Sequence, residues 1–176
     1  MGALWNVDTC SNSAMSGHMD CLVYTHGKTS AYRTWDTCMN AAWNGHIDCL
    51  ICARENRCPW NEDTCIYAAW NGHKDCLVYA RENGCPWDER TCSYASFEGH
   101  LDCLVYAREN GCSWDEQTCR YARLNGHMDC LDYAKKKNGC TRGKFNNTTC
   151  LTVMCLFIIT YILFVKESYS RILERA

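Results

Sequence analysis

Cysteine and histidine are the residues of this chain whose types and spacing could do chemistry. The 176-residue sequence holds 17 cysteines and 6 histidines. A unit typified by Thr91–Cys112 places Cys92, His100, Cys103 and Cys112 in the pattern Cys-x7-His-x2-Cys-x8-Cys. Thiolates and imidazoles are the ligands that Zn²⁺ prefers in structural sites. One interpretation is therefore a zinc-binding repeat protein.

Packing of reduced thiols is the alternative that we favour for these cysteines. The units lack the Cys-x2-Cys knuckles common in zinc sites, and cysteine often behaves as a small buried hydrophobe. No signal peptide is visible at the start of the sequence, and the cysteine count is odd, so a secreted disulfide scaffold fits poorly. We expect neither metal nor cofactor, and disulfides are the third alternative.

Five repeats account for this spacing. Gly-His recurs at 17–18, 45–46, 72–73, 99–100 and 126–127, in steps of 28, 27, 27 and 27 residues. Self-similarity at such a period indicates stacked supersecondary units. The five units occupy residues 1–140, and 14 of the 17 cysteines fall at three recurring positions within them.

Each unit predicts two short helices that position these residues. Asp88 suits an N-cap, Gly99 suits the left-handed residue that ends a first helix, and Asp102 would face the positive end of a second helix. No alternating strand pattern is visible. We therefore predict an all-α solenoid of helix-turn-helix units. The Gly-His histidines would tie neighbouring units together, and Trp35, Trp60, Trp87 and Trp114 would pack between them.

The units resemble ankyrin repeats. Residues 41–50, Ala-Ala-Trp-Asn-Gly-His-Ile-Asp-Cys-Leu, resemble the ankyrin segment around Gly-His, and residues 81–85 resemble the end of its second helix. Each unit has 27 residues and is therefore shorter than the ankyrin repeat, which has 33 residues. The missing residues correspond to the β-hairpin finger. Short, Cys/Trp-rich units are also similar to ankyrin-like arrays of giant viruses. The resemblance implies a protein–protein interaction scaffold.

Two recurring positions vary from unit to unit and are our predicted contact residues. By the ankyrin resemblance, the first helix of each unit lines the binding surface. The variable positions are the residue after Thr-Cys and the residue three further on. The predicted partner-binding set, an apolar middle with a basic end, is Met39, Ile66, Ser93, Arg120, Ala69, Ser96 and Arg123. The alternative is that these positions are merely exposed and unconstrained.

The composition changes after the repeats. Residues 141–147 form a basic and polar linker, 148–165 carry no charge, and 166–176 form a polar tail. As a helix, 148–165 would span about 27 Å, slightly short of a hydrocarbon core of about 30 Å. We predict a C-terminal hydrophobic helix that anchors the chain in a host-cell membrane, with the array on the cytosolic side because the upstream flank is basic. The alternative is a degenerate sixth unit that caps the solenoid.

Charge and motif content narrow the function. A net charge of −2 disfavours a nucleic-acid binder. Polar residues recur by repeat rather than converging on one site, so we predict no enzymatic activity. The expected function is a monomeric scaffold or adaptor for an unidentified protein partner. A structural scaffold without a discrete ligand, and an adaptor to host ubiquitin machinery as in some viral ankyrin proteins, are the alternatives.

Overall fold

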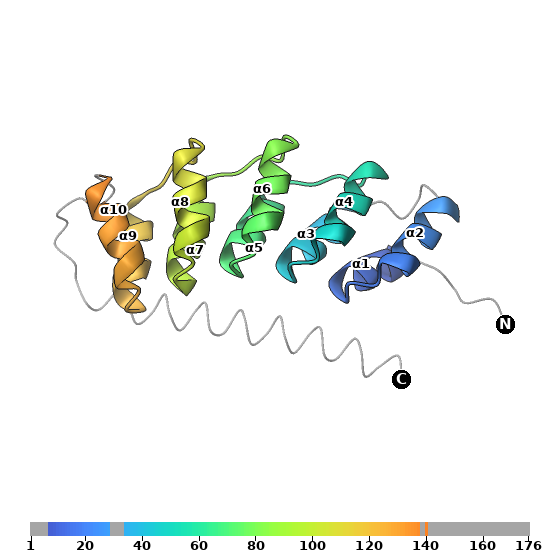
Figure 1. The fold of residues 1–176 in the computed structure, drawn as a ribbon, viewed down its shortest axis with the longest axis horizontal. Helices are drawn as coiled ribbons and strands as arrows, with labels where there is room; N and C mark the ends of the chain where they lie inside the picture. The colour runs from blue at the N-terminus through green and yellow to red at the C-terminus, as the bar shows by residue number, and fades with distance from the viewer. Residues whose placement is uncertain (1–6, 29–33, 138–139, 141–176) are drawn as a thin grey trace. The chain divides into compact units, whose positions relative to one another are not determined.

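A computed structural model describes residues 7–28, 34–137 and 140, which form five consecutive pairs of α-helices without a strand (Figure 1). Each pair corresponds to one sequence unit, which confirms the predicted helix-turn-helix repeat. The helices are α1 (Val7–Met15), α2 (Met19–Lys28), α3 (Trp35–Trp43), α4 (Ile47–Glu55), α5 (Glu62–Trp70), α6 (Lys74–Glu82), α7 (Glu89–Glu98), α8 (Leu101–Glu109), α9 (Glu116–Leu124) and α10 (Met128–Lys136).

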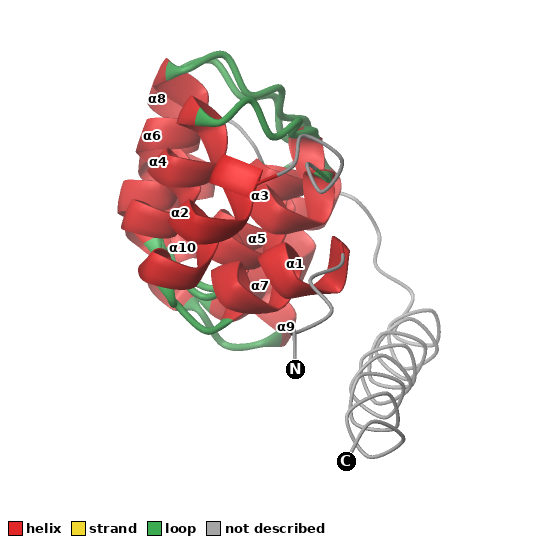
Figure 2. Ribbon diagram, turned by 90° about the vertical axis from the view of Figure 1, so that its right-hand side faces the viewer, coloured by secondary structure: helices red, strands yellow, loops and turns green. Residues whose placement is uncertain are grey.

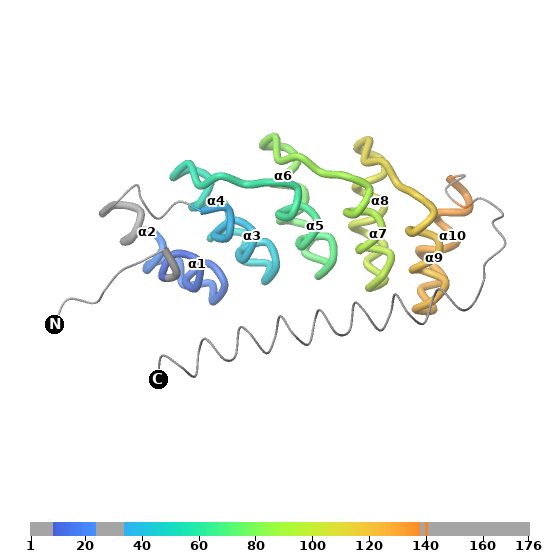
Figure 3. Tube along the Cα trace, turned by 180° about the vertical axis from the view of Figure 1, so that it is seen from behind, coloured from blue at the N-terminus to red at the C-terminus, as the bar shows by residue number. Residues whose placement is uncertain are grey.

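The helices form two layers. The first helices of the units (α1, α3, α5, α7 and α9) lie side by side in one layer, and the second helices lie in the other (Figure 2). The first helices pack against one another more closely than the second helices do. The described connectors between units run along one edge of the array without a strand (Figure 3). The predicted absence of the β-hairpin finger is therefore confirmed for these connectors.

Local sequence signals begin and end the helices as expected. The Asp88 carboxylate accepts a hydrogen bond from the backbone N–H of Arg90 at 3.0 Å, so it caps α7. Asp115 caps α9 in the same way, accepting from the N–H of Gln117 at 2.9 Å. Gly99 ends α7 at φ +80°, a conformation that a side chain disfavours.

Small side chains make the core. The Thr-Cys cysteines have at most 2% of their surface exposed, and the turn cysteines Cys58, Cys85 and Cys112 have none. Alanines and one leucine per unit complete the core, the leucines being Leu22, Leu50, Leu77, Leu104 and Leu131. Cysteine and alanine are short, so adjacent helices can approach closely. The predicted packing of thiols is confirmed for most described cysteines.

One pair of cysteines corrects the prediction of reduced thiols. Cys119 in α9 and Cys140 form a disulfide, with their Cα atoms 5.7 Å apart. The other thirteen described cysteines are thiols. Cys140 follows the second helix of the last unit and is half-buried, unlike its fully buried equivalents in the preceding units.

Histidines join the units through contacts with glycines. Each Gly-His histidine from His46 onward lies against the glycine of the preceding unit, as His100 lies against Gly72. His73 also hydrogen-bonds the backbone of Trp43 in the preceding unit. The prediction that these histidines tie one repeat to the next is confirmed.

Tryptophans join the units on the connector side. The guanidinium of Arg54 lies 4.2 Å from the Trp60 ring centroid and donates a hydrogen bond to the Cys58 carbonyl at 3.2 Å. Tyr79 of the next unit meets Trp60 edge-on, with ring centroids 6.4 Å apart. The same arrangement recurs at Arg81–Trp87–Tyr106 and Arg108–Trp114–Tyr133. The predicted inter-repeat packing is confirmed for these three tryptophans.

The predicted hydrophobic helix at 148–165 and its flanks lie outside the described residues. Among the helices that the structure does describe, none combines the length and apolarity needed to cross a membrane. The anchor therefore stays a prediction from the sequence.

Adding a methyl group where a histidine covers a glycine should destabilise the array. Gly72 has φ +74°, and a Cβ there would lie 2.6 Å from Nδ1 of His100. We expect Gly72→Ala to cost about 1–2 kcal/mol of backbone strain and about 1–3 kcal/mol more for displacing the ring. Gly84→Ala is the matched control, because Gly84 has φ +83° and nothing within 4 Å of that Cβ. Equal losses in urea unfolding would contradict the importance of this contact.

Acid should weaken the junction at His73. Burial lowers the pKa of His73 below its usual value, and the neighbouring His100 and His46 also lower it, partly offset by the hydrogen bond to Trp43. Because its pKa is lower in the folded state, the contribution of His73 to stability is present above the unfolded pKa of about 6.5. It is lost as the pH falls through that value toward the depressed folded pKa.

Urea unfolding at pH 7.5, 6.0 and 5.0 measures this dependence. The wild type should lose more stability between pH 7.5 and 5.0 than the His73→Gln variant, whose side chain does not titrate. The same change in unfolding free energy in both proteins would show that His73 does not contribute.

Candidate protein-recognition surface

Most of the predicted contact residues are buried. Ala69 and Ser96 have no exposed surface, and Ile66 and Ser93 are 2% and 4% exposed. Side chains this buried cannot form a contact surface in the folded array. The prediction is therefore wrong for these four residues.

Hydrogen bonds show where the position after Thr-Cys points. The Ser93 hydroxyl donates to Asp115 at 3.1 Å and lies 3.3 Å from the hydroxyl of Thr118, and both partners belong to the next unit. This position thus faces along the array, into the junction with the following unit. Its variation reflects packing between units rather than recognition of a partner.

The other predicted contact residues keep some exposure. Met39 on α3 and Arg120 on α9 are half-buried, and Arg123 on α9 is exposed. Arg120 donates a weak hydrogen bond to Gln117 at 3.5 Å. These three residues lie on two different first helices, and the structure does not bring them into one patch with the buried four.

Aromatic rings line the solvent side of the first helices instead. They are half-buried and occupy two positions three residues apart, on the face opposite the buried cysteine. We call this set the aromatic ribbon, and it consists of Trp43, Tyr67, Trp70, Tyr94, Phe97 and Tyr121.

Ring contacts make the aromatic ribbon continuous across four units. Trp70 on α5 stacks on Tyr94 of α7 with ring centroids 4.5 Å apart and planes within 3° of parallel. Trp43 on α3 lies 5.7 Å from Trp70, and Phe97 on α7 meets Tyr121 of α9 edge-on at 5.4 Å. Such offset and edge-on pairs are favourable arrangements that hold the rings in place. The ribbon is therefore a preorganised surface rather than a set of mobile side chains.

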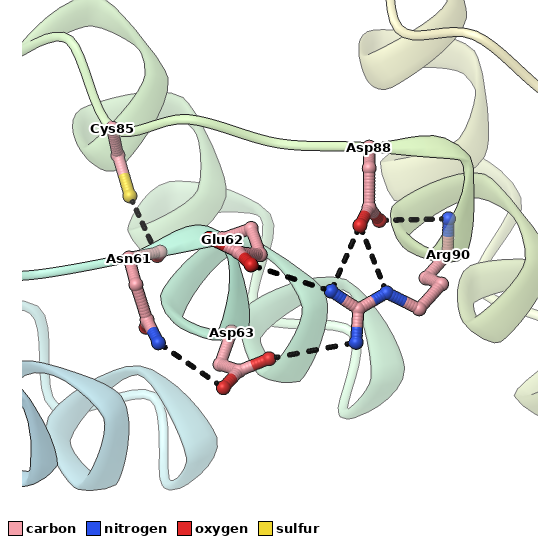
Figure 4. Close-up of polar contacts among 6 residues, drawn as sticks. All are labelled: Asn61, Glu62, Asp63, Cys85, Asp88 and Arg90. Atoms are coloured by element: carbon pink, nitrogen blue, oxygen red, sulfur yellow. Dashed lines mark hydrogen bonds and ion pairs between the residues drawn. The ribbon is translucent and has the colours of Figure 1, made fainter.

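Charged groups border the ribbon near its centre. The guanidinium of Arg90, at the start of α7, lies 2.8 Å from the carboxylate of Asp88, which caps the same helix (Figure 4). It also lies 3.6 Å from Glu62 and 3.8 Å from Asp63, and both of these carboxylates belong to α5 of the preceding unit. Burial raises the pKa of Tyr67, and the nearby charge of Asp63 raises it further. The tyrosines therefore stay protonated at neutral pH and can donate or accept hydrogen bonds.

The sequence carried a signal for this ribbon that our interpretation missed. Tyrosine recurs at 67, 94 and 121, and an aromatic residue recurs at 43, 70 and 97, three residues from it. The predicted contact set rests on variability between units, and among the aromatic residues only the connector tryptophans are assigned a role. Recurrent aromatics on the face opposite the core would have pointed to this surface.

The described residues offer little else that resembles a binding site. A cavity of about 230 Å³ lies at the junction of units two and three and is lined by Ile47, His73 and Lys74, among others. In the part of the chain that the structure covers, no three His, Cys, Asp or Glu side chains gather as a metal site. The zinc interpretation thus gains no geometric support, and the expected lack of catalysis stays a prediction.

Comparisons with known proteins place the fold. No family model matches the sequence, and neither does any curated protein. The structure is similar to the crystal structure of the human ASB11 ankyrin repeat domain, with a TM-score of 0.64 and 15% sequence identity. The match covers 75% of this chain and 69% of that one. The described helices therefore have the fold of an ankyrin-repeat solenoid.

Proposed function

We propose that this chain is a protein-recognition scaffold whose contact surface is the aromatic ribbon. The observation that carries the proposal is the run of six half-buried rings in contact across α3, α5, α7 and α9. The ankyrin-repeat fold supports this class of function, because a solenoid presents an extended surface for a partner.

Energetics favour aromatic rings for this task. Tryptophan and tyrosine are enriched at the centres of protein interfaces, where they bury a large area with few rotatable bonds. Ring-to-ring contacts already restrict the ribbon side chains, so a partner that covers them immobilises little further. The half-buried state leaves part of each ring accessible to a partner.

Charge should set the orientation of the partner. The C-terminal end of the first-helix layer carries Arg120 and Arg123, whereas Glu62 and Asp63 lie nearer its centre. We propose that a partner places acidic groups at the α9 end and apolar groups on the ribbon. Complementary charges of this kind contribute mainly to orientation and association rate.

Removing the central ring should weaken binding, whereas removing a connector ring should not. Trp70→Ala deletes the indole that contacts Trp43 and Tyr94. We expect the affinity for captured partners to fall roughly 30-fold, as at an interface hot spot of about 2 kcal/mol. The measurement is quantitative capture from source cells followed by titration of each captured protein.

Trp87→Ala is the matched control, because it deletes the same side chain from the connector edge. Circular dichroism should show helical content near that of the wild type for both variants. Retention of every captured protein by folded Trp70→Ala, or equal losses in the two variants, would contradict the ribbon as the contact surface.

The uncharged segment 148–165 leads us to propose membrane attachment as a second property. An 18-residue helix is close to the thickness of a hydrocarbon core. Membranes from cells that express the full chain should retain it through alkaline carbonate extraction, whereas a chain that ends at residue 147 should be released. Release of the full chain would refute the anchor without affecting the recognition proposal.

A further inference from the structure

Two of the recurring cysteine positions face each other in units two to five. We call the Thr-Cys residue the helix cysteine and the residue after the second helix the turn cysteine. In unit five they are Cys119 and Cys140, which are joined as a disulfide. The equivalent pairs of units two, three and four are Cys38 with Cys58, Cys65 with Cys85, and Cys92 with Cys112.

The three earlier pairs are dithiols, and in units three and four the two thiols are in contact. The thiols of Cys65 and Cys85 are hydrogen-bonded to each other, and so are those of Cys92 and Cys112. In unit two the Cys38 thiol points at the Cys58 carbonyl, with sulfur and oxygen 3.9 Å apart. All six residues are fully buried. In units three and four the two thiols thus already lie within hydrogen-bond reach of each other.

The turn holds its cysteine in position for such a contact. The Cys85 thiol donates to the Asn61 carbonyl at 3.2 Å (Figure 4), and the Cys112 thiol donates to the Asp88 carbonyl at 3.1 Å. Each acceptor carbonyl belongs to the residue before the first helix of the same unit. The turn cysteine therefore bridges the end of its unit to the beginning.

We propose that the Cys38–Cys58, Cys65–Cys85 and Cys92–Cys112 pairs are redox sites that close to disulfides, as Cys119–Cys140 does, by exchange with a small-molecule disulfide of the glutathione class. The inference goes beyond the recognition function and does not depend on it.

The exchange balances in two steps. The thiolate of a turn cysteine attacks one sulfur of the small disulfide, whose S–S bond breaks to leave a mixed disulfide and one small thiolate. The helix cysteine thiolate then attacks the turn sulfur, forms the intrachain S–S bond and expels the second small thiolate. The two cysteine protons pass to the two released thiolates. Two protein thiols are oxidised, and one small disulfide is reduced to two thiols.

The surroundings favour the turn cysteine as the entry point. The hydrogen bond from Cys92 lowers the pKa of Cys112, which increases its thiolate fraction. Gly84 and Gly111, directly before Cys85 and Cys112, are exposed, so local opening of the turn suffices to admit the small disulfide.

The cysteines of Asp-Cys-Leu provide a contrast within the same chain. Burial raises the pKa of both Cys76 and Cys103 to about 12, and neither has a cysteine of its own unit as a hydrogen-bonded partner. The pKa of the helix cysteines Cys38, Cys65 and Cys92 is also raised, so the contrast lies in the partner thiol. A mixed disulfide on Cys76 or Cys103 has no paired thiol of its own unit to resolve it. Closure of a helix–turn pair would instead link the two ends of a unit and hold its helix pair together.

Peptide mapping of the full chain tests the proposal. The protein is reduced, equilibrated under native conditions with oxidised glutathione, alkylated after denaturation and digested without reductant. We expect cross-linked peptides for 38–58, 65–85 and 92–112 in addition to 119–140. Full alkylation of the three earlier pairs, or cross-links that fall mainly on Cys49, Cys76, Cys103 and Cys130, would overturn the proposal.

A pair of variants connects the cross-links to stability. Oxidation of the reduced protein should raise the thermal unfolding temperature, and Cys85→Ala should make that rise roughly a quarter smaller, since one of four closing pairs is lost. Cys76→Ala is the matched control and should keep both the 65–85 cross-link and the full rise. An equal rise in unfolding temperature in the wild type and in Cys85→Ala would overturn the proposed effect on stability. The peptide map of the wild type tests the pairing even if Cys85→Ala does not fold.

Discussion

The close approach of neighbouring units is the constraint on which the rest of the structure depends. The His100 ring lies where a side chain on Gly72 would otherwise be, and the same contact recurs along the array. Only short side chains fit behind it, so cysteine, alanine and serine occupy the core of the first helices. The abundance of cysteine is thus a consequence of spacing between helices. The aromatic rings on the opposite face touch one another because the helices that carry them are held this close.

The periodic part of the structure could be predicted because it depends on neighbours in sequence. Asp88 and Gly99 act as caps through backbone groups a few residues away, and the repeat period specified which positions share a face. The contacts between units were harder to assign. Ser93 looked exposed because it varies, whereas its hydroxyl bonds Asp115 and Thr118 of the next unit. A helical face that points along the array would face solvent in an isolated helix. In the stacked array the next unit covers that face.

The pairing of Cys119 with Cys140 could not be predicted from the sequence for the same reason. Sequence spacing placed Cys119 and Cys140 at two buried positions, and nothing local indicated that those positions meet. Their contact brings Cys140, which follows α10, against Cys119 of α9. The disulfide confines its loop to one unit, so it does not cross a junction between units. Any oxidation of this kind stabilises units one at a time and leaves the angles between them unchanged.

The connector tryptophans are not equivalent along the array. Trp60, Trp87 and Trp114 each contact an arginine and a tyrosine. At the first boundary the sequence has His26 and Cys52 at those two places, and Trp35 is 47% exposed. The first boundary therefore does not repeat the arginine–tryptophan–tyrosine set of the later boundaries. The junctions that carry the full set join units two to five, and these are the units over which the aromatic ribbon runs, so the ribbon is backed at every junction by a connector tryptophan on the opposite edge.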